Sequence, residues 1–275
     1  MSTQPTGSAP SWQSRAALAA LGVAAALAPP TACAGPVLDR IRSLGTVRVC
    51  IWPDYYGITY RDARTGLLRG MDIDLSASFA KDLGVNLHYV ESSFAQLVDK
   101  LRGDHCDIAM HAVGITPQRQ DVLNFSQPYL QSGIYAVTTR SNRTVRQWGD
   151  IDRAGVKVAV QAGTFMEPIM AEALKQAQLV IVRPPQTREQ ELESGRTDVF
   201  ITDYPYSRRL LDNADWARLV APPQTLHPVP YAYAVKPGDD EWLRQVDQFV
   251  AQIKRDGRLE AAARRHGLTE ILWLK

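Results

Sequence analysis

Apolar and polar positions along the chain follow two different periods. Apolar runs of strand length recur along most of the sequence, at residues 46–52, 85–91, 108–110, 133–139, 156–161, 178–182, 197–203 and 231–235. Several intervening segments repeat their apolar residues every three or four positions, which is typical of a helix with one buried face. Segments with this repeat lie at residues 74–83, 94–103 and 240–256, and residues 187–195 and 259–267 are also predicted to be helices. Strands that alternate with helices predict an α/β fold around a largely parallel sheet.

One predicted helix has recognisable ends. Asp74 stands before the apolar positions of residues 75–83, and its carboxylate can accept hydrogen bonds from the free amide groups of a first helical turn. Gly84 follows the last apolar position and can adopt the left-handed conformation that ends many helices. We therefore expect a helix that is capped by Asp74 and closed by Gly84.

The stretch 106–129 combines a buried strand with a helix start. Residues 108–110 are apolar, and Thr116 and Pro117 follow in the order that favours a helix N-terminus. Arg119 comes two residues later, so its guanidinium stays close to the free amides of that terminus. Amide groups and a guanidinium together suit a carboxylate. The sequence predicts a carboxylate site here.

Other candidate residues fall at the same edge of the predicted sheet. Parallel sheets bind ligands beyond the carboxyl ends of their strands. Trp52 ends the strand 46–52 and Tyr55 follows it, and His111 and Arg119 follow the strand 108–110. We expect these four side chains to lie near one another.

The residues around Arg119 resemble a known family. GITPQRQDVLNFSQPYLQSG (114–133) resembles a pattern in which I-T-x-x-R precedes F-S-x-P-Y. This pattern is found in the extracellular solute-binding proteins of family 3, the periplasmic receptors for polar amino acids. Three more segments resemble that family in the expected order, namely GLLRGMDIDL (66–75), VAVQAGT (158–164) and SGRTDVFITD (194–203). The resemblance extends over roughly residues 40–270.

The resemblance implies an architecture. We expect a periplasmic-binding-protein-like α/β fold with two Rossmann-like lobes joined by two hinge crossings. Lobe 1 would comprise residues 35–128 and 236–275, and lobe 2 would be an insertion at residues 134–230. The hinge crossings would lie at residues 129–133 and 231–235. The ligand would bind in the cleft between the lobes, which two short crossings allow to close.

The resemblance also implies roles for single residues. Arg119 matches the family position that holds the ligand α-carboxylate, and Asp203 matches the position that takes its α-ammonium. Tyr55 and Phe94 match aromatic walls, although Phe94 also suits a protein core and Asp203 also suits a helix cap. The full expected site is Trp52, Tyr55, Phe94, His111, Gly114, Thr116, Arg119, Thr164, Phe165 and Asp203, with Tyr56, Tyr204 and Tyr206 as further candidates.

Four positions depart from the family pattern, one of which is Gly57, where proline is frequent. Gly114 stands where a hydroxyl or small polar residue is usual, and Phe165 follows Gly163-Thr164 where another hydroxyl residue is usual. Trp52 occupies a place where the family often has aspartate. These changes remove two hydroxyl donors and make the cleft more aromatic. The expected ligand is therefore an aromatic or apolar amino acid, or a carboxylate without an amine.

The first 34 residues predict export. Arg15 precedes a stretch without charges, Ala16–Ala28, that is too short to span a bilayer comfortably. Ala32-Cys33-Ala34 then fits a small-x-small cleavage site, so residues 1–34 are expected to be a signal peptide. Lipid attachment at Cys33 is the alternative, but lipoprotein signals have an aliphatic residue where this chain has Pro30. We expect a periplasmic protein without a lipid anchor.

Composition and cysteine placement exclude several classes. A formal net charge of +2 on 275 residues argues against nucleic acid as a partner. Cys50 lies late in one strand and Cys106 before another, so their offset predicts two free thiols rather than a disulfide. The five histidines show no metal-ligand spacing, and no phosphate loop or nucleophile elbow occurs. No metal or cofactor is expected.

Two functions from different classes remain after these exclusions, and a ligand sensor for a separate membrane kinase stays open as a third. The first is a monomeric receptor that delivers a small carboxylate, such as an amino acid, to a membrane ABC permease. The second is an exported cyclohexadienyl (prephenate/arogenate) dehydratase, a class that resembles these receptors and shares VRVC, ITYRD and DIAM with this chain. Glu167 matches the catalytic glutamate of those enzymes, but a glutamate in a first helical turn is also favoured by the helix dipole. We expect the receptor.

Overall fold

The computed structural model describes residues 35–275, and their strands form two larger sheets and a small one. The first sheet has the order β5-β1-β6-β14-β7, and β8 also pairs with β14. Its strands are β1 (Thr46–Ile51), β5 (Asn86–Glu91), β6 (Ile108–Gly114), β7 (Asn124–Phe125), β8 (Leu130–Ser132) and β14 (Val229–Val235). The predicted export signal and Cys33 lie outside the described residues.

The second sheet repeats the same plan. Its order is β11-β10-β12-β9-β13, with β9 (Ile134–Thr139), β10 (Lys157–Gln161), β11 (Gln178–Val182), β12 (Val199–Asp203) and β13 (Ala217–Val220). The small sheet contains β2 (Asp54–Tyr55), β3 (Thr59–Arg61) and β4 (Leu68–Arg69). In each larger sheet three strands are parallel, β5-β1-β6 and β11-β10-β12, and the others run antiparallel to their neighbours. The predicted α/β fold is confirmed.

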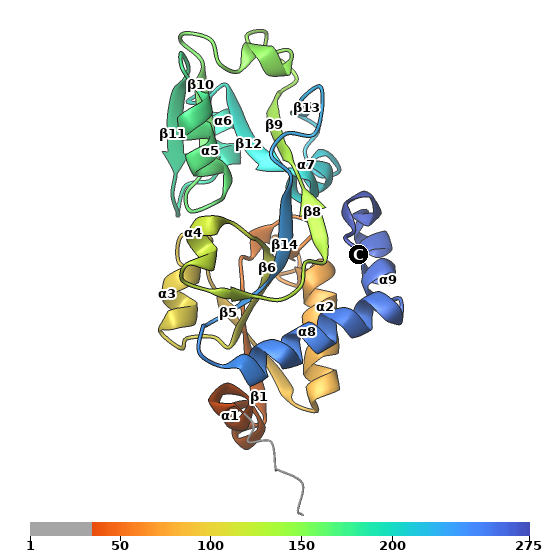
Figure 1. Ribbon diagram of the computed structural model, residues 1–275. Coiled ribbons are helices and arrows are strands. Elements are labelled where there is room, and N and C mark those ends of the chain that lie inside the picture. The colour runs from red at the N-terminus through yellow and green to blue at the C-terminus, as the bar shows by residue number, and fades with distance from the viewer. Residues whose placement is uncertain (1–34) are drawn as a thin grey trace, which may run out of the picture. The chain divides into compact units, whose positions relative to one another are not determined.

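Helices cover both sheets. They are α1 (Pro36–Leu44), α2 (Met71–Leu83), α3 (Leu97–Arg102), α4 (Pro117–Gln120), α5 (Met166–Ala173), α6 (Arg188–Glu193), α7 (Tyr204–Leu211), α8 (Asp240–Arg255) and α9 (Arg258–His266), with short 3₁₀ turns η1 (Trp148–Asp150) and η2 (Thr269–Ile271). Figure 1 shows α2, α8 and α9 together beside the first sheet, and α5 and α6 beside the second. The buried stripe of α8 fixes its orientation, since Trp242 Nε1 donates to the Asp107 carbonyl at 2.8 Å.

The chain passes between the larger sheets twice. It leaves the first sheet at Gly133, between β8 and β9, and returns through residues 221–228, between β13 and β14. All of β14 pairs within the first sheet, and Tyr231 lies opposite Gly114 of β6. Residues 231–235 are therefore sheet residues, while the division into two lobes with a hinge stays a prediction.

Two predicted helix starts are wrong. Helix α2 begins at Met71 rather than after Asp74, because Gly70 at φ +134° lies so close to Ile58 that a Cβ would be 2.1 Å from its carbonyl oxygen. The glycine thus turns the chain into the helix earlier. Helix α3 begins at Leu97 rather than at residue 94, after a turn at 93–96. The end of α2 at Gly84, with φ +68°, is as predicted.

The structure joins Cys50 and Cys106 in a disulfide, so the prediction of two free thiols is wrong. That prediction assumed that Cys106 continues the straight line of β6. In the structure the Asp107 N–H donates to the Arg48 carbonyl at 2.8 Å, and the chain turns just before this residue. The turn brings the two cysteine Cα atoms to 5.6 Å. The bridge lies in an apolar cluster with Leu97 and Leu101 of α3.

A buried carboxylate links α2 to the strands that lead to the second sheet. Asp72 is fully buried, and its Oδ2 accepts from the Ala112 N–H at 2.9 Å and from the Tyr129 hydroxyl at 2.5 Å. The Tyr233 hydroxyl donates to Oδ1 at 3.1 Å. Burial raises the pKa of Asp72 to about 7, and the three hydrogen bonds oppose the rise. The folded protein therefore holds this proton at a pH where the unfolded chain has lost it.

This raised pKa predicts a pH-dependent stability. Between about pH 4 and pH 7 the folded state binds more protons at Asp72 than the unfolded state, so the free energy of unfolding falls as pH rises. We expect Asp72→Asn to remove this contribution, because an asparagine amide can accept from Ala112 and Tyr129 and donate to the Tyr233 hydroxyl. Urea denaturation of both proteins from pH 4 to pH 8 would measure the difference. Parallel pH profiles would contradict the assignment.

Candidate functional site

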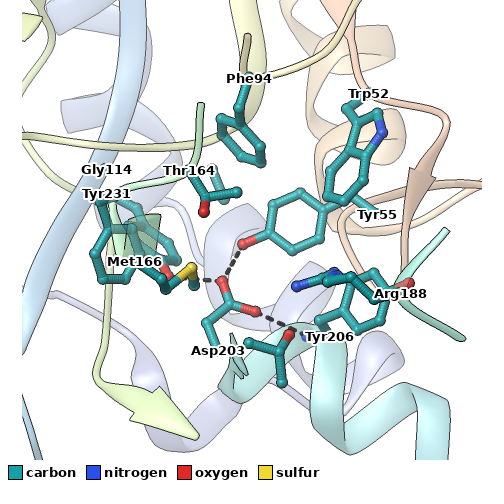
Figure 2. A pocket seen from close by; sticks show the side chains of 13 residues that line it. Trp52, Tyr55, Phe94, Gly114, Thr164, Met166, Arg188, Asp203, Tyr206 and Tyr231 are labelled. Carbon is teal, nitrogen blue, oxygen red and sulfur yellow. Dashed lines mark hydrogen bonds between the residues drawn. The ribbon is translucent and has the colours of Figure 1, made fainter. Parts of the chain in front are cut away.

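A cavity opens between residues of the first sheet and residues of the second. The space between its lining atoms is about 310 Å³, including its opening to solvent. The lining residues are Trp52, Tyr55, Phe94, Ala112, Gly114, Thr164, Phe165, Met166, Arg188, Thr202, Asp203, Tyr206 and Tyr231. Figure 2 shows these side chains turned toward a common centre. The wall is mainly aromatic, with one carboxylate and one guanidinium.

Asp203 lies at the junction of β12 and α7 and is 2% exposed. Its Oδ1 accepts from the Tyr206 N–H at 3.2 Å, so the predicted helix cap is present. Its Oδ2 accepts from the Tyr231 hydroxyl at 2.7 Å and from the Tyr55 hydroxyl. Burial raises the pKa of Asp203, and the two tyrosine hydroxyls and the amide act against the rise. Three protein donors thus occupy most of this carboxylate.

Arg119 follows β6 in the short helix α4 and is 8% exposed. The Thr116 hydroxyl accepts from the Arg119 N–H at 3.3 Å, so the predicted cap is present. The guanidinium donates to the Gly114 carbonyl at 2.8 Å and to the Gly163 carbonyl at 2.9 Å, and it lies over the Phe94 ring at 5.3 Å. Burial lowers the pKa of Arg119 to about 10, so the side chain is charged at neutral pH.

Arg119 is close to the cavity without being among its lining residues. It packs against two residues that do line the cavity, Phe94 and Gly114. No carboxylate of residues 35–275 lies within 4 Å of its guanidinium. The cation is therefore held by carbonyl groups and an aromatic face, which leave its charge uncompensated.

Four aromatic rings form one wall of the cavity. Trp52 lies 5.4 Å from Tyr55 and 5.4 Å from Phe94, measured between ring centroids. Trp52 also stacks with Tyr206 of the second sheet region at 6.1 Å. Such rings provide apolar contact area with fixed geometry. The wall suits a ligand with an aromatic or aliphatic body.

The turn after β10 forms another part of the cavity lining, through Thr164 and Phe165. Gly163, at φ +75°, lies so close to residues 94–95 that a Cβ would be 2.4 Å from the Ala95 nitrogen, so glycine is needed at this contact. A Cβ at Gly114 would lie 3.3 Å from the Phe165 ring. Gly114 and Phe165, which both depart from the family pattern, thus fit each other, because the absence of a side chain at Gly114 leaves space for the Phe165 ring.

The structure brings most of the predicted residues together. Trp52, Tyr55, Phe94, Gly114, Thr164, Phe165 and Asp203 line the cavity, and so does the further candidate Tyr206. Thr116 caps α4 away from the lining. His111 is fully buried beside Phe94, with Nδ1 at 3.2 Å from the Cys50 carbonyl oxygen, and burial lowers its pKa to about 4. The ligand contacts of all these residues stay predictions.

Five lining residues were not predicted from the sequence, namely Ala112, Met166, Arg188, Thr202 and Tyr231. Tyr231 lies in a segment that was predicted as a hinge. Arg188 stands in the polar run TREQELE, which indicates an exposed helix, and only the packing of α6 turns this side chain inward. The signal available for Arg188 was its place at the helix start, which does not fix the direction of a side chain.

The described residues hold no cluster suited to a metal ion and no helix suited to cross a membrane. Between residues 35 and 275 no group of three or more His, Cys, Asp or Glu side chains is arranged to hold a metal ion. Among the helices of the same residues, none has both the length and the apolar character needed to cross a membrane.

Comparison with known proteins gives relatives of two kinds. The chain is 32% identical over 231 residues to a cyclohexadienyl dehydratase from Pseudomonas aeruginosa, covering 81% of this chain and 82% of the relative. It is 24% identical over 225 residues to the L-cystine-binding protein TcyJ from Escherichia coli, covering 82% of this chain and 84% of that protein.

A solved structure supports the fold assignment. The ancestral amino acid-binding protein AncCDT-1, described as a precursor of cyclohexadienyl dehydratase, superposes with a TM-score of 0.75 at 31% identity. The match covers 83% of this chain and 98% of that chain. The predicted fold class of periplasmic binding proteins is confirmed. Residues 47–269 match the bacterial extracellular solute-binding proteins, family 3, and the chain belongs to this family.

Proposed function

We propose that this protein is an exported receptor that binds a small carboxylate in the cavity and delivers it to a membrane ABC permease. The observation that carries the proposal is Arg119, a buried guanidinium beside the cavity without a carboxylate partner among the described residues. A buried charge of this kind is costly unless a counter-ion pairs with it. A ligand carboxylate is the natural counter-ion, because a guanidinium binds it with two parallel hydrogen bonds.

The ammonium role of Asp203 is less well supported than the carboxylate role of Arg119. A carboxylate offers about four acceptor positions, and Tyr55, Tyr231 and the Tyr206 amide fill three of them. An ammonium group would compete with the two hydroxyls. Because of this competition, the expected ligand is a carboxylate without an amine, and an aromatic amino acid is the alternative ligand.

A panel of ligands tests the proposal. Thermal-shift and calorimetric titrations would include phenylalanine, glutamate, cystine, phenylpyruvate, 3-phenylpropionate and benzylmalonate, each compared with its amide or ester where one exists. We expect binding to require a free carboxylate, since the amide cannot neutralise Arg119. Equal binding of the acid and its neutral derivative would refute the proposed site.

The second candidate is a dehydratase, which the 32% identity to a cyclohexadienyl dehydratase favours. Its expected proton-transfer group, Glu167, lies in the first turn of α5, next to the cavity-lining residue Met166. Glu167 Oε2 accepts from the Gly163 N–H at 2.7 Å, and the side chain does not line the cavity. A carboxylate that orders its own turn is better suited to a structural role than to proton transfer, which needs direct reach to the substrate.

Incubation with prephenate or arogenate separates the two candidates. For a receptor we expect no phenylpyruvate or phenylalanine above the buffer control. Glu167→Gln should change ligand affinity only modestly, because helix-end electrostatics contribute about 0.3–1 kcal/mol. Wild-type turnover that disappears in Glu167→Gln would reverse the assignment in favour of the enzyme.

A further inference from the structure

Arg188 is a second buried cation, and it points into the cavity. It is the first residue of α6, is 3% exposed and lines the cavity. Its guanidinium lies over the Tyr206 ring at 4.3 Å and over the Phe200 ring at 5.1 Å. Figure 2 shows the guanidinium directed toward the space between Tyr55 and Asp203. The side chain is therefore fixed in place and faces the ligand space.

Most donors of Arg188 have no protein partner. Of the five N–H donors of a guanidinium, Nη1 donates to the Ile201 carbonyl at 2.8 Å, and this is the hydrogen bond that its side chain makes within residues 35–275. No carboxylate of these residues lies within 4 Å of the guanidinium. The neighbouring Glu189 accepts from the Tyr206 hydroxyl and lines the adjacent groove instead.

The charges around the cavity do not balance for a zwitterion. Counting the lining residues and the adjacent Arg119, Arg119 and Arg188 supply two positive charges and Asp203 supplies one negative charge when it is ionised. Glu167 and Glu189 do not line the cavity, and they accept hydrogen bonds from the Gly163 amide and the Tyr206 hydroxyl. An amino acid with a neutral side chain adds no net charge, so one of the two buried guanidinium groups would remain unpaired. An unpaired buried charge is strongly unfavourable. The cavity favours a ligand with net negative charge.

We propose that Arg188 is a second anion anchor and that the ligand is a small dicarboxylate with an aromatic or aliphatic body. This inference rests on the proposed function, in which Arg119 holds the first carboxylate. Arg119 follows β6 of the first sheet, and Arg188 contacts Ile201 of β12 in the second sheet. A dicarboxylate therefore contacts both halves of the cavity, and the wall formed by Trp52 and Phe94 contacts its apolar body.

Pairs of ligands that differ in one carboxylate test this proposal. Benzylmalonate is 3-phenylpropionate with a second carboxylate, and glutamate differs from glutamine in one charge at nearly equal size. Calorimetry at pH 7 would compare these pairs on wild type, Arg188→Met, and the control Arg208→Met, which changes an exposed arginine of α7. We expect wild type to prefer the dicarboxylate of at least one pair by about tenfold or more, as one charge-assisted bidentate contact allows.

Arg188→Met should abolish this preference while it leaves the monocarboxylate affinity within about threefold, and Arg208→Met should change neither. Equal loss for both ligands of a pair would show that Arg188 only supports Tyr206, and would overturn the inference. If Arg188→Met does not fold, Arg188→Lys can be tested instead. Lysine keeps the positive charge but lacks the planar guanidinium that lies over Tyr206, and this variant should retain the preference for the dicarboxylate. If wild type binds monocarboxylates through Arg119 and shows no preference for dicarboxylates, the inference about Arg188 is refuted and the proposed function stands. A wild type that binds no carboxylate refutes the proposed function as well.

Discussion

Replacing Arg119 by alanine is expected to lower the affinity for the carboxylate ligand by about 30-fold to several-thousand-fold. Truncating one partner of a buried, hydrogen-bonded charge pair costs on the order of 2–5 kcal/mol, and each 1.4 kcal/mol is tenfold in the dissociation constant. The effect should be large here because carbonyl groups and an aromatic face hold the guanidinium, and no carboxylate of residues 35–275 lies within 4 Å of it. A ligand carboxylate would thus lose its counter-ion.

Calorimetry with the tightest ligand of the panel would measure this loss. Arg208→Ala, on the exposed surface of α7, is the matched control and should bind as wild type does. Arg119 also donates to the Gly114 and Gly163 carbonyls, so thermal unfolding of each variant must be recorded beside the affinity. Arg119→Lys keeps a point charge and should retain part of the affinity. A folded Arg119→Ala protein that binds within threefold of wild type would refute the site.

Removing the Cys50–Cys106 bridge is expected to lower the free energy of unfolding by about 2–5 kcal/mol. The bridge closes a loop with a sequence separation of 56 residues, for which the loop-entropy relation gives about 4 kcal/mol. The half-cystines also pack against Leu97 and Leu101, so alanine at both positions leaves unfilled space in that cluster. The variant Cys50→Ala/Cys106→Ala should therefore unfold at lower denaturant concentration.

Denaturation with and without a reducing agent isolates the contribution of the bridge. Reductant should shift wild type toward the double variant and leave the double variant unchanged. Thiol titration of the denatured, unreduced chain should detect neither Cys50 nor Cys106. Two reactive thiols at these positions, together with a stability that reductant does not alter, would show that the bridge does not form in the protein.

Local chemistry explains what the sequence predicted well. The alternation of apolar runs indicated the strands, since burial of one face repeats at short intervals along the chain. Thr116 caps the helix of Arg119, and Asp203 caps α7, because both contacts join residues three positions apart. The end of α2 at Gly84 follows from the left-handed conformation that glycine adopts there. These features depend on near neighbours, so a single sequence contains the information.

The errors arose where a distant residue decided the local structure. Helix α2 starts early because the backbone of Gly70 lies against Ile58. The capping character of Asp74, which the sequence shows, gives no sign of this contact. The disulfide required the turn before β6 that carries Cys106 out of the strand line. An assumption of straight strands therefore placed the two sulfurs too far apart.

The sequence by itself determined the α/β class and the family. It also placed Arg119 and Asp203 at the starts of helices, because motifs and caps are short and local. Only the tertiary structure decided what these groups contact. The Asp203 carboxylate accepts hydrogen bonds from the hydroxyl groups of Tyr55 and Tyr231, which are 148 and 28 residues away in the chain. Arg188 turns inward because the packing of α6 against β10 and β12 directs its side chain between aromatic rings. Side-chain direction across packed elements depends on sheet order and helix placement, which no local pattern encodes.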